Sequence, residues 1–102
     1  MATFYTADQI TALYGIASDL QMNAHAAGDL DSLLDLHSAG MHTLYRTPIP
    51  CHIAARAWDT ILRHAPEDYG VLITGLTPDE VGELNRYIAG LIYRNARVRR
   101  AS

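Results

Sequence analysis

Apolar residues recur along this chain with the 3.6-residue period of an α-helix, most clearly between residues 7 and 27. At 100° per residue, seven apolar side chains of this segment fall on one side. They are Ile10, Leu13, Ile16, Ala17, Leu20, Ala24 and Ala27. Because small alanines alternate with larger residues on this side, the pattern predicts a helix that a second helix can approach closely.

Two predicted helices begin with a capping box. In this motif a threonine side chain bonds the backbone N–H of the third residue after it, and the glutamine or glutamate there bonds back. The pairs Thr6–Gln9 and Thr77–Glu80 fit this pattern. The second pair is followed by an apolar periodic stretch, which predicts a helix over residues 78–97.

Two more helices are predicted between these, over residues 30–45 and 48–65. Prolines are tolerated in a first helical turn, so Pro48 and Pro50 suit the start of the second of them. Gly40 is a candidate kink in the first. The apolar face of the first carries Leu30, Leu33, Leu34, Met41 and Leu44, and that of the second carries Ala54, Ala57, Trp58, Ile61, Leu62 and Ala65. Trp58 is the expected core anchor.

Residues 69–74 fit either a short strand or a short helical turn. The chain offers no second strand to pair with them, so a helical turn or an extended crossing is the preferred interpretation. The sequence therefore predicts an all-α fold, with residues 1–102 forming one domain of four helices. A short basic tail, residues 97–102, follows the last helix.

The last predicted helix is apolar over an unusually wide surface, about 140°, where a helix packed on one side needs roughly 100°. The excess predicts burial on two sides, either in the middle of the domain or against a partner. Together with the alanine-rich side of the first helix, it favours a homodimer. Tyrosine and arginine are over-represented at interface hot spots. The predicted partner-binding residues are Arg86, Tyr87, Leu91, Ile92, Tyr93 and Arg94.

Charge is sorted along the chain. Residues 1–45 contain five aspartates and no lysine or arginine, whereas residues 86–102 contain five arginines and no acid. Such sorting would let the acidic half of one copy face the basic end of another. The net charge of −3 argues against non-specific binding along a phosphate backbone. The alternative function is nevertheless a helical nucleic-acid-binding transcriptional regulator that uses helix 78–97 and the arginine-rich tail.

No catalytic, cofactor-binding or metal-binding motif is present. Cys51 and His52 are adjacent but diverge by about 100° on a helix, and the cysteine is expected in the core. His37 and His42 are five residues apart, so a helix does not align them as metal ligands. His37, in the middle of an apolar face, is either satisfied by a neighbouring polar group or part of a pH-sensitive interface.

A single cysteine fits a reducing compartment, and no apolar run approaches the roughly 20 residues that span a bilayer. No secretory signal is visible, so a cytoplasmic protein without a membrane partner is expected. All eight basic residues are arginines, which suggests a GC-rich bacterial or phage genome. We expect a small non-enzymatic protein–protein interaction module. It would act as a regulatory inhibitor, anti-activator or adaptor that covers an apolar surface of a partner protein.

Overall fold

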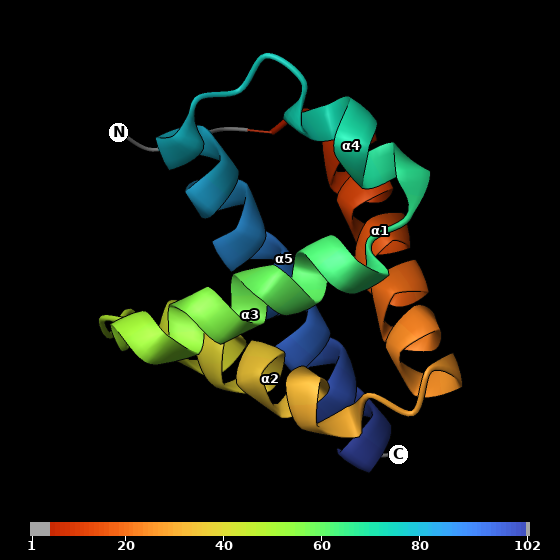
Figure 1. The fold of residues 1–102 in the computed structure, drawn as a ribbon, viewed down its shortest axis with the longest axis vertical. Helices are drawn as coiled ribbons and strands as arrows, with labels where there is room; N and C mark the ends of the chain where they lie inside the picture. The colour runs from red at the N-terminus through yellow and green to blue at the C-terminus, as the bar shows by residue number, and fades with distance from the viewer. Residues whose placement is uncertain (1–4, 102) are drawn as a thin grey trace.

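The computed structural model describes the backbone of residues 5–101 and the side chains of residues 5–95. This part of the chain forms five helices joined by turns and contains no strand (Figure 1). The helices are α1 (Ala7–Ala26), α2 (Leu30–Leu44), α3 (Cys51–His64), α4 (Glu67–Ile73) and α5 (Pro78–Ala101). The all-α prediction is confirmed, and the predicted count of four helices is wrong.

The additional helix, α4, occupies the segment that the sequence left between strand and helical turn. Pro66 precedes it, and two acidic residues, Glu67 and Asp68, lie in its first turn, where the helix dipole favours negative charge. Its one buried side chain is Tyr69, whose hydroxyl donates to Asn85 Oδ1 of α5 at 2.8 Å. The short helix is therefore fixed to the core through a satisfied buried hydrogen bond.

Both capping boxes are confirmed. The Thr6 N–H donates to Gln9 Oε1 at 2.8 Å and the Gln9 N–H donates to Thr6 Oγ1 at 3.2 Å. The corresponding distances between Thr77 and Glu80 are 3.0 and 3.2 Å. These bonds satisfy amide groups that a helix start leaves without partners, so α1 and α5 begin where the sequence predicts.

Two predicted boundaries change. The third helix starts at Cys51 instead of residue 48. A proline ring clashes with the residue before it and disfavours the helical conformation there, and Ile49 precedes Pro50. The backbone of α5 stays helical to Ala101, beyond the predicted end at residue 97. The side chains of Arg97, Arg99 and Arg100 lie outside the described residues.

The helix α5 passes through the middle of the domain and packs against α1, α2 and α3. In Figure 1 it runs behind α2 and α3, with α1 to one side. Its buried apolar residues, Leu84, Ile88, Ala89, Leu91 and Ile92, belong to one core cluster with the α1 residues between Leu13 and Ala24 and with Leu33, Leu36 and Ala39 of α2. The wide apolar surface of this helix is therefore covered on more than one side within the domain.

Only some of the residues of α3 that were predicted to lie in the core are buried there. Ala57 and Ile61 are buried as expected, whereas Leu62 is 67% exposed and Trp58 is only partly buried against the core. Cys51, expected in the core, is exposed. The core side of this helix is thus narrower than its apolar composition predicts.

The helix α2 faces the core with a different side from the predicted one. Leu33 and Leu36 are buried together with the small residues Ala39 and Gly40. The predicted face included three residues that lie outward, namely Leu30, Leu34 and Met41. The helix also continues without interruption through Gly40, which was a candidate kink.

Gly40 explains this orientation because α2 and α5 cross there. A Cβ atom on Gly40 would lie 2.7 Å from the carbonyl carbon of Ala89 and 2.8 Å from Tyr93 Cβ, closer than van der Waals contact allows. Only glycine permits the backbones to approach this closely. The crossing therefore fixes which side of α2 is buried.

Replacing Gly40 by alanine should lower the free energy of unfolding by about 1–3 kcal/mol, because the added methyl group overpacks the crossing. Gly90→Ala is the matched control. Its Cβ would meet nothing closer than Thr43 Cγ2 at 3.9 Å, and alanine in a helix is favoured over glycine by about 0.5–1 kcal/mol. Urea unfolding of both variants measures the difference. Equal stability of Gly40→Ala and the parent would contradict the close crossing.

Candidate functional site

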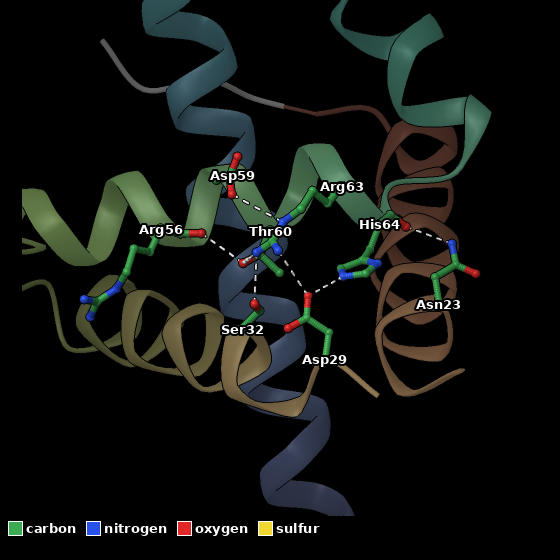
Figure 2. Close-up of polar contacts among 8 residues, drawn as sticks. All are labelled: Asn23, Asp29, Ser32, Arg56, Asp59, Thr60, Arg63 and His64. Atoms are coloured by element: carbon green, nitrogen blue, oxygen red, sulfur yellow. Dashed lines mark hydrogen bonds and ion pairs between the residues drawn. The ribbon is translucent and has the colours of Figure 1, made fainter. Parts of the chain in front are cut away.

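A cluster of polar side chains joins α2 to α3 and reaches α1 (Figure 2). We call it the α2–α3 polar cluster. Its members are Asn23, Asp29, Ser32, Asp35, Arg56, Asp59, Thr60, Arg63 and His64. Figure 2 shows that Asp29, at the start of α2, points toward both Arg63 and His64 at the end of α3.

Asp29 is the most strongly bonded carboxylate of this cluster. It lies 2.7 Å from His64 Nε2 and 3.5 Å from Arg63 Nη1. The hydrogen bond with His64 is the main reason that the pKa of Asp29 is held below its ordinary value of 3.8, and Ser32 and Arg63 act in the same direction. The backbone carbonyl of His64 also accepts a 2.8 Å hydrogen bond from Asn23 of α1. Polar contacts of Asn23, Asp29 and His64 thus link α1, α2 and α3 at this point.

The cluster contains an aspartate, a histidine and a serine, but their arrangement is not that of a hydrolase. Such an enzyme needs the imidazole to bond the serine hydroxyl that it activates. Here Ser32 Oγ accepts from Arg63 Nη2 at 3.0 Å and bonds Asp29, and Asp29 is the one described side chain that the imidazole bonds. The geometry is that of a link between helices.

The remaining ion pairs of the cluster link α3 to α2 or brace α3 itself. Arg56 Nη2 lies 3.2 Å from Asp35 of α2, and Arg63 Nε lies 3.3 Å from Asp59 one turn earlier. The Arg56 and Arg63 side chains are half exposed or more. Such exposed pairs contribute on the order of 0–1 kcal/mol each. They orient α3 on α2 more than they stabilise the fold.

The predicted partner-binding residues of the last helix separate into two groups. Leu91 and Ile92 are 4% and 0% exposed, so their side chains belong to the domain core. Arg86 and Arg94 are exposed, and Tyr87 and Tyr93 are half-buried. The Tyr87 ring packs against that of Tyr5, with centroids 5.2 Å apart and a tilt of 58°. Tyr93 lies beside Gly40 of α2.

Four other large apolar side chains lie on the surface in a row along α2. Leu30, Leu34, Met41 and Tyr45 are 54%, 63%, 37% and 60% exposed. Their spacing of four, seven and four residues places them on one side of the helix, and we call them the outer face of α2. His37 lies between them and is half-buried.

The sequence reading missed this face because α2 carries apolar residues on two sides. The signal that separates the sides is the small pair Ala39–Gly40, which marks the close approach to another helix. Given that pair, the buried side follows as Leu33, Leu36 and Gly40. Leu30 and Leu34 do not belong to this buried side and therefore lie on the surface.

Within residues 5–101, no helix combines the length and the apolar character needed to cross a bilayer. Among the described side chains, the histidine, cysteine and acidic groups form no cluster of three that could hold a metal ion. The exposed Cys51 and His52 begin α3.

No model of a known protein family matches the sequence, and searches of curated proteins and of solved structures find no similar chain.

Asp29→Asn should reduce the loss of folding stability that the protein shows as the pH falls below about 4. A carboxyl with a lowered pKa in the folded state stabilises the fold above its unfolded pKa, and this contribution is lost as the pH falls through the lower folded value. Thermal unfolding followed by circular dichroism below about pH 4 measures the slope. The control is Asp31→Asn, which removes a carboxylate from the same helix turn outside the cluster. Superimposable profiles of the two variants would contradict the role of Asp29.

Proposed function

We propose that this protein is a small non-enzymatic interaction module whose main contact surface is the outer face of α2. The observation that carries the proposal is the row of exposed large apolar side chains, Leu30, Leu34, Met41 and Tyr45. Contiguous exposed apolar surface on a small domain marks interaction sites. The module acts as a regulatory inhibitor, anti-activator or adaptor, by covering an apolar surface of its partner.

The spacing of the outer face suits a helix as the partner element. Positions 30, 34, 37 and 41 follow the alternating four- and three-residue steps of a helix-pairing seam. His37 occupies one step of this seam. A polar residue at such a position favours one register of pairing over others.

A second copy of the chain is the partner that the charges favour. In an antiparallel pair of α2 helices, Leu34 lies opposite Met41 of the other copy, and Leu30 lies opposite Tyr45. The acidic first turn with Asp31 then lies beside the end of the other α2, where Arg46 follows. Opposite charges and opposed helix dipoles both support this arrangement. We therefore propose a homodimer.

The surface members of the predicted α5 patch remain secondary contacts in the proposal. They are Arg86, Tyr87, Tyr93 and Arg94. The single cysteine is exposed and free, which suits a reducing compartment, so we propose a cytoplasmic setting.

Nucleic-acid binding through α5 has less support. A recognition helix needs one side free to enter a groove, whereas α5 packs against three other helices. Binding to nucleic acid would weaken steeply with rising salt concentration, whereas pairing through an apolar seam would not.

The double variant Leu34→Asp, Met41→Asp tests the proposed dimer. Both side chains are exposed in the domain, so the fold should persist, and circular dichroism checks this. Burying a leucine or methionine contributes about 1.5–3 kcal/mol, so we expect at least about a 100-fold higher dimer dissociation constant. Sedimentation equilibrium over a range of protein and salt concentrations measures it.

Leu62→Asp, Val71→Asp is the matched control, because these apolar residues of α3 and α4 are at least as exposed as Leu34 and Met41. The control should dimerise like the parent, with little dependence on salt. A parent that stays monomeric at every concentration would overturn the dimer. Dimers that survive in the α2 variant would place the interface elsewhere.

A further inference from the structure

A pocket of about 500 Å³ lies where the α2–α3 connection meets α5. Its lining includes His42 near the end of α2, Arg46 and Thr47 in the connection, and Arg86 on α5. The volume falls within the range of small-molecule sites, roughly 300–1,000 Å³. Its lining residues differ from those of the outer face of α2, although Arg46 directly follows Tyr45.

The charge of this pocket is entirely positive. Its lining residues include two arginines, Arg46 and Arg86, and no acidic residue. Of the three other arginines with described side chains, Arg56 and Arg63 are each within 4 Å of an aspartate, and Arg94 forms no ion pair with a described carboxylate. Neither pocket arginine forms an ion pair with a described carboxylate, although the chain has a net charge of −3. Two arginines without an ion pair to a described carboxylate thus line the same pocket.

Arg46 is also held in an unfavourable backbone conformation. Its φ of 57° lies in the left-handed region, where it is the only non-glycine residue of the described chain. Residues with a Cβ atom avoid this region, and glycine or asparagine is the usual occupant. Hydrogen bonds hold the turn on both sides, from the Arg46 N–H to the Thr43 carbonyl and from the Thr47 N–H to the His42 carbonyl. The left-handed conformation of this turn would therefore form more easily with glycine, so the backbone does not account for an arginine at position 46.

The lining of the pocket also includes the apolar residues Pro48, Ile49 and Ala54. A ligand that fills the space thus combines an anionic group with an apolar body. The arginine fork bonds phosphate and carboxylate oxygens in pairs. A phosphate monoester carries about −1.5 to −2 charges at pH 7, which matches two guanidinium groups better than a carboxylate does.

We infer that the pocket between the α2–α3 connection and α5 binds a small organic phosphate monoester, with its phosphate on Arg46 and Arg86 and its apolar part against Pro48 and Ile49. This inference goes beyond the proposed interaction surface. Because Arg46 and Arg86 also belong to the contacts proposed for the homodimer, binding is measured on the Leu34→Asp, Met41→Asp variant as well as on the parent, so that the two proposals can fail separately.

Phenyl phosphate is the probe, and isothermal titration calorimetry at constant ionic strength measures its binding to the full chain. We expect saturable binding, at least tenfold weaker binding of benzoate, and no binding of phenol. Cys51 lines the same pocket and is the chain's single cysteine. Its alkylation by the uncharged reagent N-ethylmaleimide should slow as phenyl phosphate saturates the site.

Two variants remove the charges one at a time. Arg46→Gly should weaken phenyl phosphate binding at least tenfold while the melting temperature stays equal or rises, because glycine adopts the left-handed conformation freely. Arg86→Gln should weaken it to a similar degree. Arg94→Gln is the matched control, since it removes one exposed arginine from the same helix two turns away, outside the pocket, and should bind like the parent.

Several outcomes overturn the inference. Absence of saturable binding rejects the site. Equal losses in Arg94→Gln and Arg86→Gln show attraction to net charge alone, and equal affinity for benzoate rejects phosphate selectivity. Binding of a short DNA duplex without binding of phenyl phosphate rejects the small ligand in favour of a nucleic-acid backbone.

Discussion

The close crossing of α2 and α5 at Gly40 and Ala89 determines how the rest of the domain is arranged. The two backbones meet without an intervening side chain, which only glycine permits at this point. Because helices are rigid cylinders, one close contact sets the rotation of each about its axis. It buries Leu33 and Leu36, leaves Leu34 and Met41 outside, and puts α5 within reach of α1 and α3.

The sorted charges of the sequence acquire a local explanation in this arrangement. Asp29 and Asp35 of the acidic first half pair with Arg63 and Arg56 of α3, the helix that lies alongside α2. These acids therefore act within the domain. Arg46 and Arg86 have no such partner among the described carboxylates, and they are the residues that we propose to bind the phosphate group in the pocket.

The sequence predicted those features of the fold that depend on residues close together in the chain. Capping boxes depend on residues three positions apart, so Thr6–Gln9 and Thr77–Glu80 located two helix starts correctly. The buried side of α2 could not be read in this way, because its choice depends on a contact between residues 40 and 89. For the same reason Leu91 and Ile92 resembled an interface from sequence, while their burial comes from other helices of the same chain. The pocket of Arg46 and Arg86 joins residues forty positions apart and left no sequence signal.

Native-state hydrogen exchange on the monomer tests most directly whether α5 is the internal helix of this domain. Amides that open only by global unfolding exchange slowest. In a sample dilute enough for sedimentation to show only monomers, the amides of residues 88–92 and of residues 36–40 should be the slowest of the chain, with closely similar opening free energies. Fast exchange at residues 88–92, beside slow exchange in α1 and α3, would contradict the central position of α5 and the crossing at Gly40.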